Sequence, residues 1–248
     1  MDLAQFWEQH PRAAIAFSGG VDSAYLLYSA VHSGAAVKAY YAKTAFQPQF
    51  ELEDAKKLAA QLGAEMEILS LDVLSVPHVA ENPANRCYYC KKALFSVLSA
   101  AAHRDGFQLL LDGTNASDQA GDRPGMQALA ELSVRSPLRE CGLTKAVIRR
   151  LSKEAGLFTH DKPAYACLAT RIPTGDTITA QKLQRTEEAE GFLHSLGLRD
   201  FRVRTLGDTA RIQVPAADLQ TVLQNREAIL DRLKQGYSGV LLDLEVRT

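Results

Sequence analysis

The sequence predicts a doubly wound α/β domain built on a parallel sheet, followed by a smaller C-terminal α+β domain. Through residues 1–175, short apolar runs of strand type alternate with segments in which apolar residues recur at helical spacing. This alternation is typical of right-handed βαβ crossovers, which produce parallel sheets. From Thr179 the order changes to a helix, two strands, a helix and a strand. We therefore expect two domains, residues 1–175 and residues 176–248.

The elements of the first domain follow from this pattern. Ala13 to Phe17 is apolar throughout, as expected of a buried strand, and the helix Asp22 to His32 carries one apolar stripe. Further strands are expected at Val37 to Ala42, Glu65 to Leu71 and Gln108 to Leu111, with the segment Ser133 to Pro137 completing the layer. Further helices are expected at Asp2 to Gln9, from Leu52 to a stop at Gly63, at Asn85 to His103, and from Thr144 to a stop at Gly156. Ligands of such sheets bind at the carboxyl ends of the strands.

The second domain follows a long irregular segment, Phe158 to Gly175, and long loops are often functional. Its expected elements are a helix from Thr179 to Gly197, strands Phe201 to Leu206 and Ala210 to Val214, a helix Ala217 to Gln235 and a strand Gly239 to Val246. This order is similar to that of ferredoxin-like folds.

Composition and charge favour a globular protein that acts on a small molecule. The chain has 248 residues, 46% of them hydrophobic, and a formal net charge of −1, which provides no overall attraction to RNA, DNA or an anionic membrane. We find no long apolar run and no N-terminal pattern of a secretion signal, so we expect a cytoplasmic protein without nucleic-acid or membrane partners. In that compartment the four cysteines stay reduced and are available for thiol or metal chemistry.

The hexapeptide Ser18-Gly19-Gly20-Val21-Asp22-Ser23 joins the first strand to a helix and predicts a phosphate site. Gly19 and Gly20 allow a tight turn that brings backbone N–H groups close to an anion, and Ser18 and Ser23 add hydroxyl donors at the positive end of the helix. The alternative is a simple Ser/Gly turn capped by Asp22. The order strand, loop, helix favours the phosphate site.

This hexapeptide resembles the SGGxDS signature of the PP-loop ATP pyrophosphatases, which activate a carboxyl or carbonyl oxygen as an adenylate and release pyrophosphate. It lacks the lysine of the G-x-x-x-x-G-K-[ST] loop, so cleavage between the α- and β-phosphates fits better than γ-transfer. The residues expected to bind ATP are Ser18, Gly19, Gly20, Asp22, Ser23, Gly113, Thr114 and Asp118. Asp22 or Asp118 is the expected ligand of Mg²⁺.

Several further motifs, in order along nearly the whole chain, resemble the LarE family. They are Asn82-Pro83-x-x-Arg86-Cys87-Tyr88-x-Cys90-Lys91, Asp112-Gly113-Thr114-Asn115, Arg123-Pro124-Gly125, Ser136-Pro137-Leu138 and Ala166-Cys167-Leu168-Ala169. The family commonly has Ser where Thr170 stands and Tyr where Thr174 stands.

The resemblance implies an ATP-dependent sulfur transferase acting on pyridinium-3,5-biscarboxylic acid mononucleotide, an intermediate of the nickel-pincer nucleotide cofactor of lactate racemase. It implies that Cys167 carries the sulfur, and that members lacking the other two thiols sacrifice this cysteine and retain dehydroalanine. It also implies a homo-oligomer, a hexamer in the family.

Cys87 and Cys90 lie one turn apart on an expected helix, and together with Cys167 they provide three soft thiolate ligands. We expect them to hold a 4Fe-4S cluster, whose fourth iron accepts sulfide from an external donor and makes the sulfur carrier renewable. The alternative is a structural zinc site closed by His160 or His78. Cys141 is interpreted as a small buried hydrophobe.

The substrate carries a phosphate and carboxylates, so guanidinium groups are expected to bind it. The expected substrate residues are Arg171, Arg202 and Arg204, with Glu190 as a further polar contact. Arg202 and Arg204 alternate with Val203 on an expected strand and match family positions implicated in phosphate binding; the alternative is a solvated edge strand.

Two other functions remain open on the sequence. A tRNA 2-thiolation enzyme also combines a PP-loop with C-x-x-C and a distant cysteine, but it should show basic stripes that this near-neutral chain lacks. A non-catalytic ATP-binding module with structural zinc is the second alternative. An amidating synthetase would need an ammonia source, and no glutaminase domain is evident.

Overall fold

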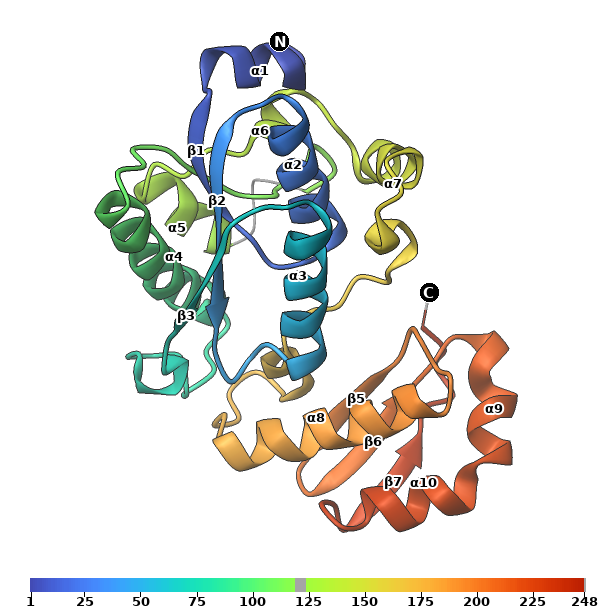
Figure 1. Cartoon of the computed structure of the whole chain (residues 1–248). Helices are drawn as coiled ribbons and strands as arrows, with labels where there is room; N and C mark the ends of the chain where they lie inside the picture. The colour runs from blue at the N-terminus through green and yellow to red at the C-terminus, as the bar shows by residue number, and fades with distance from the viewer. Residues whose placement is uncertain (119–123, 248) are drawn as a thin grey trace. The chain divides into compact units, whose positions relative to one another are not determined.

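The computed structural model describes residues 1–118 and 124–247, and a parallel sheet forms the centre of its first unit, Met1–Val76 with Asn85–Ala164 (Figure 1). The strands are β1(Arg12–Ala16), β2(Ala36–Lys43), β3(Met66–Ser70) and β4(Leu110–Leu111), in the order β3-β2-β1-β4. All three pairings are parallel, and Ile15 of β1 lies opposite Ala39 of β2 and Leu111 of β4.

Helices cover both faces of this sheet. They are α1(Leu3–Gln9), α2(Val21–His32), α3(Gln49–Gln61), α4(Arg86–Arg104), α5(Pro124–Glu131), α6(Pro137–Glu140) and α7(Lys145–Glu154), with short 3-10 turns at Val73–Ser75 and Phe158–Asp161. Ala13 and Ile15 of β1 are buried in a cluster with α2 and α3, whereas Ala14 is buried with Tyr40 and side chains of α4 on the opposite face (Figure 1). Because both faces are covered, β1 is apolar after its exposed first residue, Arg12. The predicted doubly wound α/β class is confirmed.

Two differences from the expected elements occur near the end of the sheet. β4 contains only Leu110–Leu111, and the segment 133–137 contributes a single parallel bridge between Arg135 and Leu111. Pro137 explains the second difference, because its ring removes a backbone donor and fits the first turn of a helix. It occupies that place in α6, so the chain turns into a helix instead of extending the sheet.

The second unit consists of Pro77–Ala84 and Tyr165–Thr248 and contains a three-stranded sheet. Its elements are β5(Arg202–Leu206), β6(Thr209–Gln213), β7(Gly239–Leu242), α8(Ala180–Ser195), α9(Leu219–Gln224) and α10(Arg226–Leu233), with 3-10 turns η3(Leu168–Arg171) and η4(Ala216–Asp218). β5 and β6 are antiparallel, and β6 and β7 are parallel. Leu193, Val203, Ile212 and Ile229 lie in the core between sheet and helices. The described residues therefore form a smaller α+β unit, with three strands where a ferredoxin-like fold has four.

The expected helix Ala217 to Gln235 is divided at Asn225 into α9 and α10. The side-chain Nδ2 of Asn225 donates to the carbonyl of Thr221 at 2.8 Å, a local hydrogen bond that competes with helical pairing. We expected the last strand to end at Val246, but it ends at Leu242. Directly after Leu242, the Asp243 carboxylate accepts a hydrogen bond from the Glu245 N–H at 3.1 Å, and this local contact stabilises a turn.

We expected the domain boundary near Gly175, whereas the second unit begins at Tyr165 and also includes Pro77–Ala84. Asn82 connects these two segments of the unit. Its Nδ2 donates to the Pro173 carbonyl at 2.7 Å, and its own carbonyl accepts from the Gly175 N–H at 2.9 Å. Among the described residues, no helix combines the length and apolar character needed to cross a membrane.

Candidate functional site

The predicted phosphate loop lies at the carboxyl end of β1, directly before α2. Gly19 adopts a left-handed conformation with φ of +72°, and a Cβ atom there would lie 3.0 Å from Ala55 of α3. Gly20 is extended and precedes the first turn of α2, where free backbone N–H groups attract anions. The loop therefore requires glycine at Gly19 both for its dihedral angle and for its close approach to α3.

The two serines of the loop bind each other. The hydroxyls of Ser18 and Ser23 are 3.1 Å apart, and the Ser23 hydroxyl also donates to the Gly20 carbonyl at 3.2 Å. Ser23 is buried. The buried Ser23 hydroxyl thus stabilises the conformation of the turn through hydrogen bonds to Ser18 and to the Gly20 carbonyl.

The turn after β4 packs directly on this loop. A Cβ atom on Gly113 would lie 2.8 Å from the backbone nitrogen of Ser23, so only glycine allows the two segments to approach. The Asp112 carboxylate accepts hydrogen bonds from the hydroxyls of Thr114 and Ser136 and fixes the turn. The structure therefore brings Gly113 and Thr114 next to residues 18–23, with Thr114 engaged by Asp112.

Asp22 provides the negative charge at this edge of the sheet. Its Oδ2 lies 2.6 Å from Nζ of Lys145, whereas its Oδ1 is buried and receives no hydrogen bond from the described residues. Burial raises the pKa of Asp22, the contact with Lys145 opposes this rise, and the negative charge of Asp118 adds to it. An unpaired buried carboxylate oxygen near a second carboxylate is a suitable ligand set for Mg²⁺. The backbone N–H of Asn115 donates to Asp118 at 3.1 Å and orients it.

The cysteines are distributed between the two units. Cys87 and Cys90 lie on the first turns of α4 and are three residues apart, so both sulfurs are on one face of the helix as predicted. Cys167 belongs to the second unit, and none of the four cysteines forms a disulfide within the part of the chain that the structure describes. Among residues 1–118 and 124–247, no group of three or more His, Cys, Asp or Glu side chains is arranged to hold a metal ion. The shared cluster of Cys87, Cys90 and Cys167 therefore stays a prediction.

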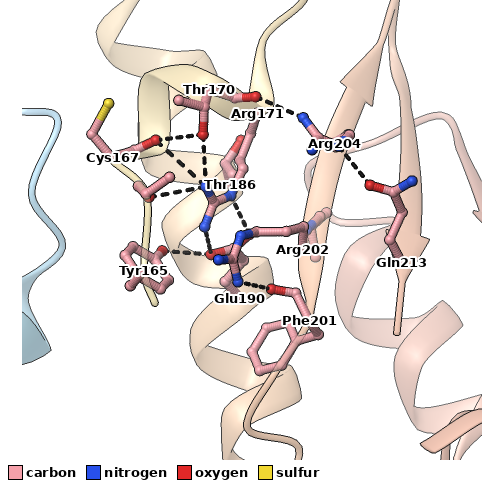
Figure 2. A network of polar contacts seen from close by, with 12 residues as sticks. Tyr165, Cys167, Thr170, Arg171, Thr186, Glu190, Phe201, Arg202, Arg204 and Gln213 are labelled. Carbon is pink, nitrogen blue, oxygen red and sulfur yellow. Dashed lines mark hydrogen bonds and ion pairs between the residues drawn. The ribbon is translucent and has the colours of Figure 1, made fainter. Parts of the chain in front are cut away.

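Arg171 and Glu190 form a buried ion pair beneath the Cys167 loop (Figure 2). Arg171 is 1% exposed, and its Nε and Nη2 donate to the two carboxylate oxygens of Glu190 at 2.7 and 3.1 Å. Nη1 of Arg171 donates to the Ala166 carbonyl at 2.9 Å, and the Tyr165 hydroxyl donates to Glu190. Burial lowers the pKa of Arg171, but the contacts with Glu190 outweigh it, so the net pKa is raised.

Two of the expected substrate residues belong to this network. Arg171 and Glu190 are buried and bonded to each other, and their contact with the substrate stays a prediction. The carbonyl of Cys167 accepts from the Thr170 hydroxyl at 2.8 Å, while its sulfur points away from the ion pair (Figure 2). Arg171 and Glu190 are therefore placed to position the cysteine loop.

Arg204 lines a cavity of about 300 Å³ in the second unit, together with Arg211, Thr205 and the segment 170–174. Arg204 donates to the Thr170 carbonyl at 2.9 Å and to Gln213. Burial, followed by the charge of Arg171, lowers the pKa of both Arg202 and Arg204, that of Arg202 to about 10. The lowered pKa values reflect the cost of burying a charged group, and the nearby positive charge of Arg171 adds to it.

Arg202 differs from Arg204 in its contacts. It is buried, its Nη1 donates to the Phe201 carbonyl at 2.6 Å, and its guanidinium lies over the ring of Tyr165 (Figure 2). Arg204 therefore faces the cavity, whereas Arg202 adds positive charge from within the unit. Thr205 also lines the cavity, and its buried hydroxyl forms no hydrogen bond with the described residues.

The sequence interpretation missed Lys145, Thr205 and Arg211. Lys145 contacts Asp22 across 123 positions, and no spacing rule indicates such a contact. The local sequence offers one indication that Lys145 is unusual: it lies in the first turn of a helix, where the helix dipole disfavours a cation. Arg123, part of one motif of the family resemblance, lies outside the described residues.

Comparison with known proteins identifies the family. Over 236 residues, 94% of this chain and 86% of the relative, the chain is 35% identical to the pyridinium-3,5-bisthiocarboxylic acid mononucleotide synthase of Lactiplantibacillus plantarum. The chain belongs to the LarE family. It is thus an ATP-dependent sulfurtransferase of the PP-loop class, and the sequence prediction of that class is confirmed.

Other similarities agree with this assignment. Residues 12–81 match the family of queuosine biosynthesis protein QueC, and this range includes the phosphate loop. The uncharacterized protein slr1717 of Synechocystis is 39% identical over 98% of this chain and 92% of its own length. The uncharacterized protein MJ0830 of Methanocaldococcus jannaschii is 29% identical over 96% of this LarE chain and 91% of its own.

Replacing Gly113 by alanine is expected to weaken binding of Mg–ATP by about tenfold or more, because the new Cβ would displace the backbone of Ser23. Isothermal titration calorimetry measures this affinity. Gly191→Ala is the matched control, since no atom lies within 4 Å of a Cβ at that position. Unchanged affinity in Gly113→Ala would show that the loop tolerates the displacement.

Replacing Glu190 by glutamine is expected to lower the free energy of unfolding by about 3 kcal/mol, because the buried Arg171 charge loses its counterion. Urea unfolding followed by circular dichroism measures the loss. Glu188→Gln, a half-exposed position on the same helix, should change stability by less than about 0.5 kcal/mol. Equal stabilities for the two variants would contradict a structural role for the ion pair.

Proposed function

We propose that this protein transfers sulfur to pyridinium-3,5-biscarboxylic acid mononucleotide in an ATP-dependent reaction, as a step in the biosynthesis of the nickel-pincer nucleotide cofactor. The observation that carries the proposal is the similarity, over nearly the whole chain, to a protein named pyridinium-3,5-bisthiocarboxylic acid mononucleotide synthase. The substrate is the corresponding acid, in which one oxygen of each of the two carboxylates is replaced by sulfur. We also propose a cytoplasmic location, which agrees with four cysteines that form no disulfide among the described residues.

The phosphate loop provides for activation of the acid. A carboxylate is a poor acceptor for sulfur, because its oxygen is a poor leaving group and its charge repels a thiolate. Attack of a carboxylate oxygen on the α-phosphorus of ATP breaks the bond to the β-phosphate, which forms an acyl-adenylate and releases pyrophosphate. Backbone N–H groups of Gly19 and Gly20 and the start of α2 bind the phosphates. Asp22 and Asp118 would hold Mg²⁺, which neutralises charge on the departing pyrophosphate.

Cys167 provides the thiol that receives the activated acyl group. Its thiolate attacks the carbonyl carbon, forms a thioester and expels AMP. Loss of the Cys167 α-proton with cleavage of its Cβ–Sγ bond then leaves dehydroalanine and releases the thiocarboxylate. This route balances without a further reactant and consumes one cysteine per sulfur transferred.

Three thiols offer a renewable alternative, which we favour for this chain. Cys87, Cys90 and Cys167 would hold a 4Fe-4S cluster, and soft thiolates suit such a cluster. When bound, the cluster would supply exogenous sulfide to the acyl-adenylate. The one-turn spacing of Cys87 and Cys90 on α4 supports two of the three ligands.

The cavity beside Arg204 is proposed to bind the phosphate of the mononucleotide. Arg204 and Arg211 line this cavity and offer positive charge to the phosphate. Thr170 stands where the family commonly has serine, so a hydroxyl is retained there.

We also propose that the protein is a homo-oligomer, and a hexamer as in its family. Several large apolar side chains of the second unit are exposed and support an association surface there; they are Leu206, Leu223, Leu241 and Leu244.

The proposed function predicts that pyrophosphate release requires the mononucleotide as well as ATP and Mg²⁺. Anaerobic incubation with these and sulfide, followed by mass analysis of protein and product, should yield the thiocarboxylate. Cys167→Ser should still release pyrophosphate but form no thiocarboxylate, whereas Cys141→Ser should match the wild type. Pyrophosphate release without the mononucleotide, or tRNA thiolation in its place, would contradict the proposal.

The same incubation distinguishes the two sulfur sources. Several turnovers with intact protein mass support the cluster, and loss of the Cys167 sulfur after one turnover supports sacrifice. Anaerobically reconstituted protein should absorb at roughly 400 nm if thiolates hold a cluster. Cys87→Ser should remove this absorption, and its absence from the wild type would eliminate the cluster route.

Substitution of Arg204 by glutamine is expected to weaken binding of the mononucleotide by about tenfold or more, because a charge-assisted hydrogen bond to its phosphate is lost. Equilibrium dialysis measures this affinity, with Arg199→Gln, an exposed position before β5, as control. Equal binding by both variants would place the phosphate elsewhere.

A further inference from the structure

Two arginines of the second unit lie directly opposite each other in its sheet. Arg204 of β5 is paired with Arg211 of β6 in the antiparallel register, and both side chains line the cavity of about 300 Å³. Like charges at directly opposite positions of a sheet are destabilising. The stability of the sheet therefore does not explain this pair, whereas an anionic ligand in the cavity would.

Two hydrogen bonds fix the guanidinium of Arg204. Its Nε donates to Oε1 of Gln213 at 2.5 Å, and its Nη1 donates to the Thr170 carbonyl at 2.9 Å (Figure 2). Because a guanidinium is planar, bonds at these two nitrogens also set the direction of Nη2. Nη2 itself forms no hydrogen bond with residues 1–118 or 124–247. The protein therefore orients Arg204 and leaves part of its hydrogen-bonding capacity for a ligand.

The residue that receives the Nε–H of Arg204 is a neutral amide. The corresponding atom of Arg171 donates to the carboxylate of Glu190, which neutralises that arginine inside the unit. Gln213 offers Arg204 the same kind of hydrogen bond without a formal negative charge. Gln213 thus orients Arg204 and leaves its positive charge available.

Asp243 sets the orientation of the Gln213 amide. Only the oxygen of an amide can accept the Nε–H of Arg204, and Nε2 of Gln213 donates to Oδ2 of Asp243 at 2.7 Å. Hydrogen bonds from Gln213 and then from the Glu245 N–H lower the pKa of Asp243, so its carboxylate stays ionised and only accepts. It therefore favours the orientation in which the Gln213 oxygen faces Arg204. The same Oδ2 lies 3.4 Å from Nε of Arg211.

We propose that Gln213 and Asp243 determine the preference of this cavity for a phosphorylated ligand. Asp243 orients the amide of Gln213, and Gln213 orients Arg204 while leaving its charge to the phosphate. Neither Gln213 nor Asp243 lines the cavity, so both act through Arg204 as positioning residues. This inference rests on the proposed function, because it requires the phosphate of the mononucleotide at Arg204.

The test compares two ligands, the mononucleotide and its dephosphorylated nucleoside, by calorimetry on the full chain. Gln213→Met has a similar size but no amide, so it should raise Kd for the mononucleotide about fivefold or more and leave Kd for the nucleoside unchanged. Gln224→Glu, at the exposed end of α9, is a control that should bind both ligands as the wild type does.

A double variant separates the charge of Arg204 from its position. Gln213→Glu combined with Asp243→Asn keeps the net charge, and the new amide can donate to the new carboxylate, so the chain of hydrogen bonds is retained. The negative charge, however, now contacts Arg204 directly. We expect Kd for the mononucleotide to rise about tenfold or more, while the midpoint of urea unfolding stays unchanged or rises. A merely structural role of Gln213 predicts no loss of binding in such a stable variant.

Three results have distinct meanings. Wild-type affinity of both variants for the mononucleotide would overturn the inference. Equal weakening of mononucleotide and nucleoside would also overturn it, because it would show a general distortion of the unit. Should the wild type bind the mononucleotide no more tightly than the nucleoside, the proposed phosphate site itself would be contradicted.

Discussion

Close packing of three chain segments at the carboxyl edge of the parallel sheet is the constraint on which the first unit depends. Gly19 lies against Ala55 of α3, and Gly113 lies against the backbone of Ser23, in both cases with no room for a larger side chain. These contacts fix the path from β1 into α2 and leave the first N–H groups of the helix open to an anion. The fold and the predicted phosphate site therefore depend on the same packing.

In the second unit, a buried ion pair stabilises the segment that carries Cys167. Arg171 and Glu190 satisfy each other, and through the Ala166 carbonyl they fix the segment that carries Cys167. Burial, followed by the charge of Arg171, lowers the pKa of both Arg202 and Arg204. The segment that carries Cys167 is thus supported by one network of arginines (Figure 2).

Local patterns were sufficient to predict the order of most elements and the doubly wound class. These patterns were insufficient at two places where a single residue changed the secondary structure. Asn225 divides a helix because its side chain binds a backbone carbonyl, and Pro137 begins a helix where an extended segment was expected. The unit boundary also required structure, because Asn82 joins two segments that are distant in sequence through hydrogen bonds to Pro173 and Gly175.

The sequence alone was sufficient to predict the family, the phosphate loop and the cysteines proposed for sulfur chemistry, because these predictions depend on residue types at short fixed spacings. Only the tertiary structure decided which charged side chains meet. It paired Lys145 with Asp22, buried Arg171 against Glu190, and left Arg204 facing a cavity. The physical reason is that an ion pair depends on distance in space and on burial, and neither quantity is encoded in the spacing of residues along the chain.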